Sequence, residues 1–422
     1  MHRLYRRTLA VFFCHWIATL GVILTSASAI VFITFQFLSF NNVYYAIVVY
    51  LIVPAFFVAG LLLIPIGVYL GSRAAGGFRA VLEDTRADDQ RLLRLAVVVL
   101  AATLANVVLM AGASYKGVEY MDSDEFCGVV CHSPMAPQYE AHMSSPHAEV
   151  ACVGCHVGPG PESFLRAKVA GLGRVMGMMT GGYDRPLRIS EVNRQPLVGA
   201  CENCHWRGQR QGEPLRLIRH YGDDQESTPM TTVLLMRVDT AIHAAHLGRD
   251  IYYRSEDPER QVIPWVSADG VEYVSSGVPN SGPQRMHCLD CHNRVAHSFG
   301  PAERVLDQAF ADQRIDRSAP FAKRDALEAL DRAAQGDPSA VAGSVELSEI
   351  LRRNVFPSMA VTWNTYPDNI GHQAYPGCFR CHDGQHSSAS GQTISQDCFG
   401  CHNLLAVEDR QPAILDQLGI SP

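Results

Sequence analysis

Cys152-Val153-Gly154-Cys155-His156 is the stretch that decides how this chain folds, because it is the first of five Cys-x-x-Cys-His units. This spacing is the attachment signature of c-type haem: two thiols form thioethers to the porphyrin, and the adjacent imidazole becomes an axial ligand of the iron. The motif residues of the five units are Cys152, Cys155 and His156; Cys201, Cys204 and His205; Cys288, Cys291 and His292; Cys378, Cys381 and His382; and Cys398, Cys401 and His402. We therefore expect bound porphyrin to supply much of the apolar core where these units lie.

A sixth unit precedes these five and has a wider gap. Cys127-Gly128-Val129-Val130-Cys131-His132 places three residues between its cysteines, which changes how the two sulfurs reach the ring. A single unit of this kind could also be half of a zinc site or a redox dithiol. Units repeated at irregular separations, each with its histidine, fit neither alternative. The sequence therefore predicts six covalently bound c-type haems, of which the first has an unusual spacing.

The chain divides by composition into two unlike parts. Residues 1–114 are largely apolar, whereas residues 115–422 are polar, rich in loops, and carry every motif. Three apolar stretches are long enough to cross a lipid bilayer, which takes about 20 helical residues. They cover approximately residues 9–40, 44–70 and 95–113. The sequence therefore predicts a membrane anchor with three transmembrane helices over residues 1–114.

The arginines predict the orientation of this anchor. Arg3, Arg6 and Arg7 precede the first stretch, and five more arginines lie between the second and third, whereas the turn at Asn41-Asn42 is uncharged. Because positive residues favour the cytoplasmic side, we expect a multi-pass protein of the bacterial inner membrane whose haem domain faces the periplasm. A cleaved signal peptide is the alternative for the first stretch, since residues 27–29 imitate a cleavage site. The apolar run continues beyond that site, which favours an uncleaved anchor.

The expected fold class is mainly α with extensive coil. N-terminal transmembrane helices are followed by a periplasmic multihaem cytochrome c domain of low regular secondary structure. The expected modules are a three-haem module over residues 115–206, a haem-free insert over 207–287, and a three-haem C-terminal module over 288–422 with a helical linker. The insert ends in a predicted β-hairpin, with strands at 263–266 and 271–274 around Asp269-Gly270. Amphipathic helices are expected at 301–310, 321–334 and 345–356.

The second axial ligand of each iron decides what that iron does. A second histidine closes the iron for electron transfer, a methionine raises its potential, and an open position permits catalysis. Nine of the seventeen histidines lie outside both the motifs and the membrane part, which is enough to close every iron. The preferred candidates, four of them near a motif and two sharing a helical face, are His147, His297, His372, His386, His243 and His246. The remaining three are His142, His220 and His287.

The region around the first two motifs carries a family resemblance. Its segments are Tyr120-Met121-Asp122-Ser123-Asp124-Glu125-Phe126-Cys127, Cys131-His132-Ser133-Pro134-Met135, Ser145-Pro146-His147 and the second motif. Together, over roughly residues 95–180, they resemble the NapC/NirT family of membrane-anchored multihaem quinol dehydrogenases. The additional spans and C-terminal motifs are similar to larger inner-membrane cytochromes of the ImcH type, which serve extracellular electron transfer.

The resemblance implies where a quinol would bind. In this family the first haem lies nearest the membrane, receives electrons from quinol, and has a methionine ligand after its motif. Met135 matches that position with one extra residue, which leaves His132 and Met135 as alternative ligands. Lys168 matches the lysine of the family's quinol pocket. The family's acidic residue has no clear match, so the candidate proton acceptors at the membrane boundary are Glu119, Asp122 and Asp124.

These features predict a membrane-bound hexahaem cytochrome that oxidises quinol, with menaquinol the expected donor, and transfers electrons to a periplasmic cytochrome or reductase. One alternative is a non-catalytic relay subunit of a larger quinone oxidoreductase complex. The other is a terminal reductase, such as one for nitrite, which would need an open iron and often a Cys-Xn-Cys-Lys unit that this sequence lacks. The net charge of −7 and the lack of a basic patch argue against a nucleic-acid partner.

Overall fold

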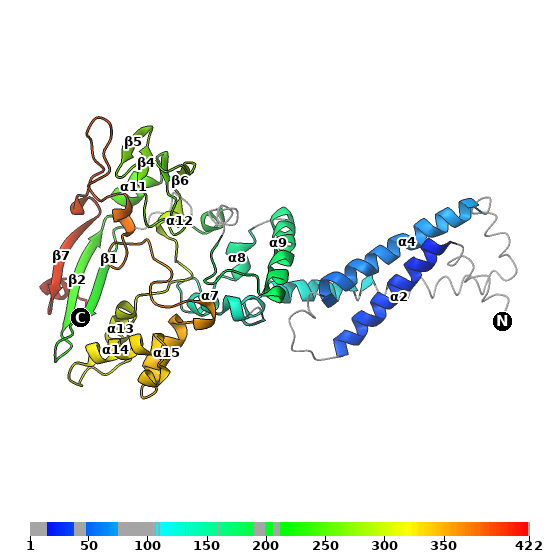
Figure 1. The fold of residues 1–422 in the computed structure, drawn as a ribbon, viewed down its shortest axis with the longest axis horizontal. Coiled ribbons are helices and arrows are strands. Elements are labelled where there is room, and N and C mark those ends of the chain that lie inside the picture. The colour runs from blue at the N-terminus through cyan, green and yellow to red at the C-terminus, as the bar shows by residue number, and fades with distance from the viewer. Residues whose placement is uncertain are drawn as a thin grey trace. The chain divides into compact units, whose positions relative to one another are not determined.

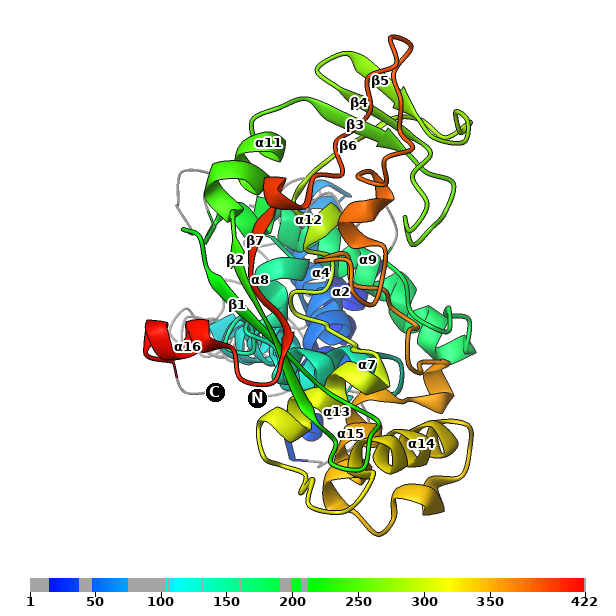
Figure 2. The same ribbon diagram turned by 90° about the vertical axis from the view of Figure 1, so that its left-hand side faces the viewer.

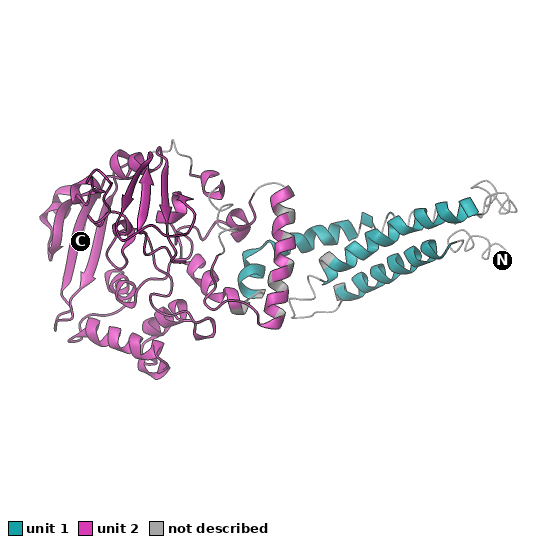
Figure 3. Cartoon of the chain, turned by 45° about the horizontal axis from the view of Figure 1, so that its top comes forward, with its two compact units in different colours: residues 1–131 teal, residues 132–422 magenta. Residues whose placement is uncertain are grey.

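The computed structural model describes residues 15–37, 48–74, 104, 107–108, 110–130, 132–158, 161–189, 199–205 and 212–420. The chain forms two compact units, residues 1–131 and 132–422, which are coloured teal and magenta in Figure 3. The boundary falls inside the first motif, between Cys131 and His132, and not at residue 114 where the composition changes. The helical run that includes residues 110–121 belongs entirely to the first unit.

Two long apolar helices dominate unit 1. Helix α2 is Trp16–Phe37, and helix α4 is Val53–Ala74, preceded by the π-helical turn η1 at Val48–Ile52. Both helices are long and apolar enough to cross a membrane, as the sequence predicts for the first two spans. The third predicted span, residues 95–113, lies largely outside the described residues. A second π-helical turn, η2 (Phe126–Val130), ends the described part of this unit.

Small residues bring α2 and α4 close together (Figure 1). A side chain at Gly60 would meet the backbone oxygen of Gly21 at 2.8 Å, and one at Gly67 would collide with the backbone of Ala18. Without a hydrophobic effect to drive association in lipid, such close backbone approach is how membrane helices pack. An apolar cluster then ties both helices to the run at 110–121; its members are Phe32, Val49, Val53, Phe57 and Met110.

Unit 2 combines short helices with seven strands among the described residues. Its α-helices are α7 (His132–Met143), α8 (Cys152–His156), α9 (Pro161–Thr180), α11 (Ala244–His246), α12 (Cys288–Cys291), α13 (Ala302–Ala311), α14 (Ala322–Ala334), α15 (Val345–Asn354) and α16 (Ala413–Leu418). Its other helical turns are η3 (Val238–His243), η4 (Pro338–Val341), η5 (Pro357–Met359), η6 (Gly377–Arg380) and η7 (Cys398–Gly400). Its strands are β1 (Leu215–Tyr221), β2 (Pro229–Met236), β3 (Ile251–Arg254), β4 (Trp265–Ala268), β5 (Val271–Val274), β6 (Gln284–Arg285) and β7 (His402–Asp409).

The strands form two antiparallel sheets, ordered β1-β2-β7 and β5-β4-β3-β6. Figure 2 shows β7, from the end of the chain, lying beside β2; Met236 stands opposite His402 in their register. Segments that the sequence analysis assigns to the insert and to the C-terminal module therefore share one sheet. The chain holds more regular β-structure than the sequence predicts, because only the β4–β5 hairpin has a local signal.

That hairpin has the turn chemistry expected of it. Asp269 and Gly270 connect β4 to β5 with φ angles of 49° and 85°. A two-residue turn of this kind needs positive φ at both central positions, which aspartate tolerates and glycine favours. The turn thus fixes the pairing of Ala268 with Val271 and, at the far end, of Trp265 with Val274.

Helices α13, α14 and α15 lie where the sequence predicts amphipathic helices, and they pack on β1. Leu306 and Leu330 are fully buried and Ile350 nearly so, in one cluster with Tyr221 of β1. Beneath this cluster Lys323 is completely buried. Its ammonium donates to an Asp307 carboxylate oxygen at 2.5 Å and to the Tyr221 carbonyl at 3.1 Å. These helices carry no motif, so their core is formed by protein side chains alone.

Candidate haem sites

Five motif histidines in unit 2 each face a second histidine. The pairs, with the distances between their ring centres, are His156–His297 at 6.1 Å, His205–His147 at 6.1 Å, His292–His243 at 6.3 Å, His382–His246 at 6.0 Å and His402–His372 at 6.2 Å. Every partner in these pairs is one of the distal ligands predicted from the sequence. The structure therefore brings together residues that lie far apart along the chain.

The spacing within these pairs fits an iron between the two rings. A metal–imidazole bond is about 2 Å long, so two imidazoles on opposite sides of one metal place their ring centres about 6 Å apart. All five pairs fall within 6.0–6.3 Å. Two imidazoles beside two cysteines form the donor set of a c-type haem with two histidine ligands.

Hydrogen bonds orient several of these rings for metal binding. The Nδ1 atoms of His246, His297 and His382 lie 2.6, 2.9 and 2.7 Å from the backbone oxygens of Ile242, Gln138 and Ser395. A ring whose Nδ1–H donates to a carbonyl keeps the lone pair on Nε2, and the same bond fixes the direction of the ring. Each of these three histidines thus presents Nε2 as its ligand atom.

Short helical turns hold the motif cysteines. In three motifs the backbone N–H of the histidine donates to the carbonyl of the first cysteine: His205 to Cys201 at 2.8 Å, His292 to Cys288 at 2.7 Å and His382 to Cys378 at 3.0 Å. Residues three apart on a helical turn share a face, so both sulfurs point to the same side. Because the turn depends only on neighbouring residues, the motif can be recognised from the sequence alone.

The histidines that face the fourth and fifth motif histidines come from one helical turn. His243 ends η3 and His246 ends α11, which follows it without a break. His243 faces His292, whereas His246 faces His382. The sequence analysis expects a ligand from this pair; the structure places both residues against motif histidines.

His386, which the sequence analysis also predicts as a distal ligand, has a different environment. It is almost fully buried, its Nδ1 lies 2.8 Å from Asp383, and its Nε2 lies 2.7 Å from the carbonyl oxygen of Ile263. Both ring nitrogens are therefore occupied by the chain, and neither is left for an iron. These two contacts tie the loop after the fifth motif to the residues before β4.

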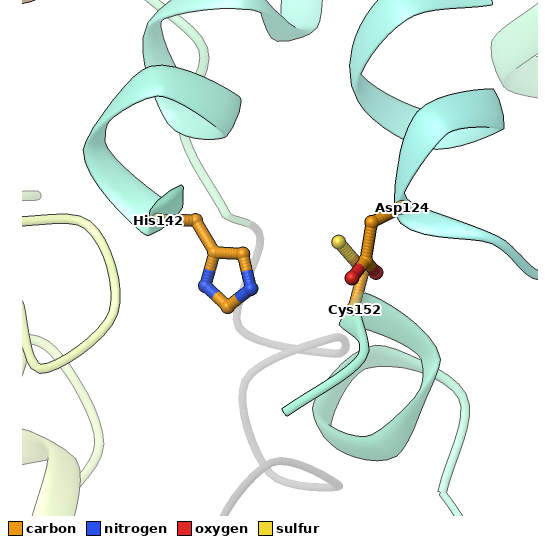
Figure 4. Close-up of side chains that lie close together, drawn as sticks. All are labelled: Asp124, His142 and Cys152. Atoms are coloured by element: carbon orange, nitrogen blue, oxygen red, sulfur yellow. The ribbon is translucent and has the colours of Figure 1, made fainter. Parts of the chain in front are cut away.

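His142 is a buried histidine near the second motif. Its ring centre lies 6.0 Å from that of His297, and its Nε2 has no hydrogen-bond partner among the described residues. Figure 4 shows His142 on α7 and Cys152 at the start of α8 facing a common space, with their ligand atoms within 4.8 Å of each other. Asp124, also labelled there, belongs to unit 1.

The two remaining candidate ligands, His220 and His287, have other neighbours. His220 is on β1, opposite Met230 of β2. The ring of His287 lies 3.4 Å from the Asp290 carboxylate, just before the fourth motif. Neither of these contacts involves a motif histidine.

The predicted quinol residues fall in both units. The side chains of His132 and Lys168 lie outside the described residues, although Lys168 belongs to α9 and Met135 is partly buried on α7. In unit 1 the Glu119 carboxylate accepts a hydrogen bond from Lys116 at 2.6 Å, on the surface. The two other candidate proton acceptors, Asp122 and Asp124, are partly buried.

Burial sets the ionisation of the motif groups. Desolvation raises the pKa of the Cys291 thiol to about 11 and that of Cys381 to about 12, and it lowers the pKa of His297 to about 4. Neutral thiols and neutral imidazoles are therefore favoured near pH 7. A zinc site would need thiolates stabilised by their surroundings, so the apolar environment fits porphyrin attachment better than a zinc site.

Two buried residues between motif cysteines connect two motifs, which the sequence analysis does not predict. Asp290 lies between the cysteines of the fourth motif and Arg380 between those of the fifth, and both are buried. The motif does not specify which residues lie between its cysteines, so only burial in the fold identifies Asp290 and Arg380. The Arg380 guanidinium donates to the Asp290 backbone oxygen at 2.6 Å, which links the two motifs directly.

Comparisons with known proteins identify related c-type cytochromes. Residues 89–213 match the N-terminal region of the NapC/NirT cytochrome c family. The cytochrome c-type protein ImcH of Geobacter sulfurreducens is 32% identical over 440 aligned residues, which cover 92% of this chain and 87% of ImcH. No solved structure matches the chain.

Proposed function

This chain belongs to the NapC/NirT cytochrome c family, and from that premise we propose that it is a membrane-bound hexahaem quinol dehydrogenase. Its donor is menaquinol or another low-potential quinol of the bilayer, and its acceptor is a periplasmic cytochrome or reductase. Each quinol gives up two electrons and two protons. The c-type haems, when bound, supply one-electron carriers.

The observation that carries the electron-transfer part is the set of five histidine pairs. A histidine on each side of the metal leaves no open position for a substrate, which is the arrangement of an electron carrier and not of a terminal reductase. The ligands that we assign are His297 for the second motif, His147 for the third, His243 for the fourth, His246 for the fifth and His372 for the sixth. His132 or Met135 serves the first motif, and His386 is left out of the set.

The quinol part rests on the family resemblance around the first two motifs. We assign Lys168 to hold the quinol oxygen by a hydrogen bond, and Asp122 or Asp124 to accept the protons released. Glu119 is a weaker candidate, because its carboxylate already accepts a hydrogen bond from Lys116 at the surface. The apolar helices α2 and α4 keep this end of the chain at the bilayer, with the motif-bearing unit on the periplasmic side.

A single experiment separates donor chemistry from haem binding. The full-length protein in lipid vesicles receives either a menaquinol analogue or dithionite, and reduction is followed by the haem absorbance. We expect Lys168→Ala to slow reduction by quinol at least tenfold while leaving haem content and reduction by dithionite unchanged. Arg166→Ala is the matched control, since Arg166 lies on the same helix with an exposed side chain paired to Glu162.

Two results would contradict the proposal. An unchanged quinol rate in Lys168→Ala would remove that residue from the pocket. Failure of the unmodified protein to accept electrons from the menaquinol analogue, although dithionite reduces it fully, would exclude quinol as the direct donor and favour a relay subunit of a larger complex.

A further inference from the structure

Arg380 occupies an unusual place between two motifs. It is the second spacer residue of Cys378-Phe379-Arg380-Cys381-His382, and it is only 7% exposed. Its guanidinium donates to three backbone carbonyls: Gly377 at 2.8 Å, Arg260 at 3.0 Å and Asp290 at 2.6 Å. In the part of the chain that the structure describes, no carboxylate lies within ion-pair distance of it. Arg380 is therefore a buried positive charge held by neutral acceptors.

The acceptor Asp290 is fixed just as firmly. Its carboxylate accepts hydrogen bonds from the Tyr253 hydroxyl at 2.7 Å and from the His287 backbone N–H at 2.8 Å. Its backbone oxygen, besides accepting from Arg380, accepts from the Asn369 side chain at 3.0 Å. The fourth and fifth motifs are thus joined by a buried network of hydrogen bonds between 2.6 and 3.0 Å long.

The same two motifs are joined on their distal side. His243 and His246, one turn apart, face His292 and His382 respectively. The fourth and fifth haem sites are therefore held together twice, by the η3–α11 turn and by the Arg380–Asp290 contact. The Arg380 charge, at the contact between the two motifs, therefore lies close to both haem sites.

We propose that Arg380 sets the reduction potentials of the haems at the fourth and fifth motifs, raising both by its buried positive charge, and fixes the two motifs in register. The reduced state of each site carries one positive charge fewer than the oxidised state. A fixed positive charge in a poorly solvated environment therefore favours the reduced state, because low dielectric strengthens the interaction. Three other charged residues lie near Arg380 in the sequence or in contact: Asp290, Asp383 and Arg260. The two carboxylates oppose the effect of Arg380 on the potentials, and the Arg260 guanidinium adds to it.

This inference rests on haem attachment at the two motifs, but it does not depend on quinol as the donor. The test is a potentiometric titration of the full-length holoprotein with dithionite as reductant, followed by the haem absorbance. Arg380→Met removes the charge and the three hydrogen bonds, whereas Arg380→Lys keeps the charge and loses most of the bonds. Arg324→Met, an exposed arginine on α14, is the matched control.

We expect Arg380→Met to lower two of the haem potentials, each by about tenfold in the ratio of reduced to oxidised form, which is about 59 mV for one electron. Arg380→Lys and the control should stay within about threefold of the unmodified protein. Haem content, measured by pyridine haemochrome, and the low-spin spectrum should not change in any of them.

Unchanged potentials in Arg380→Met with full haem content would overturn the proposal. So would a loss in Arg380→Lys as large as that in Arg380→Met, since the hydrogen bonds and not the charge would then be responsible. Where Arg380→Met fails to retain haem, the lysine variant decides: retained potentials support the role of the charge, and a tenfold drop contradicts it.

Discussion

Replacing His246 with alanine should open one haem iron, whereas the same change at His386 should open none. Both histidines are candidate distal ligands by sequence, and His386 lies just after the fifth motif. In the structure the His246 ring centre lies 6.0 Å from that of His382. The His386 nitrogens instead contact Asp383 and Ile263. The two variants therefore test the geometric assignment directly.

The size of the expected change follows from the number of sites. The sequence has six motifs, so one opened iron should convert about one sixth of the haem from the low-spin to the high-spin ferric form. His386→Ala should leave the spectrum as it is. It should still lower the free energy of unfolding by about 1–3 kcal/mol, because the buried Ile263 carbonyl and Asp383 lose their partner.

The assay compares absorbance spectra and electron paramagnetic resonance of the oxidised proteins at equal haem concentration, with urea titrations to measure stability. A high-spin signal in His386→Ala, or its absence in His246→Ala with full haem content, would refute the reasoning from ring geometry. The double variant His243→Ala, His246→Ala extends the test, since it should open about two sixths of the haem.

Three further predictions concern the helices of unit 2. Leu306→Ala removes a fully buried side chain and should lower the free energy of unfolding by about 3 kcal/mol in a denaturant titration. Asp307→Ala leaves the buried Lys323 without its closest carboxylate and should cost about 3–5 kcal/mol; adding Lys323→Met should recover part of that loss in the same titration. Glu349 has its pKa held at about 2 by hydrogen bonds from Arg352 and a second arginine, so the stabilisation from its charge is present above pH 4.5 and is lost between pH 4.5 and about 2. Glu349→Gln should therefore lower the free energy of unfolding slightly at pH 7, by under about 1 kcal/mol because the ion pairs are largely exposed; the difference in melting temperature from the unmodified protein should shrink as the pH falls toward 2.

The local features of this chain can be predicted from the sequence because they depend on residues that are close together along the chain. The motif turn needs only residues three and four apart, and the β4–β5 hairpin needs only the Asp269-Gly270 turn between its strands. Helices α13, α14 and α15 are readable from their apolar periodicity, and α2 and α4 from length and apolar composition. In each case the forces act within one element.

The choice among distal histidines could not be made in that way. His386 and His246 are both plausible by type and position, and only the fold places one of them opposite His382. The same holds for β7, whose partner β2 lies in a different predicted module. No pattern within eight residues specifies a strand that pairs with a segment so distant in the chain.

By itself the sequence predicts which residues attach haem and which helices are apolar enough for a membrane, because thioether chemistry and hydrophobicity act through residue type and short spacing. Only the tertiary structure decided that His297 faces His156, that one helical turn serves two motifs, and that Arg380 is buried between them. These outcomes depend on how distant segments pack together, and a ligand pair or a buried charge has its chemistry only once both sides are in place.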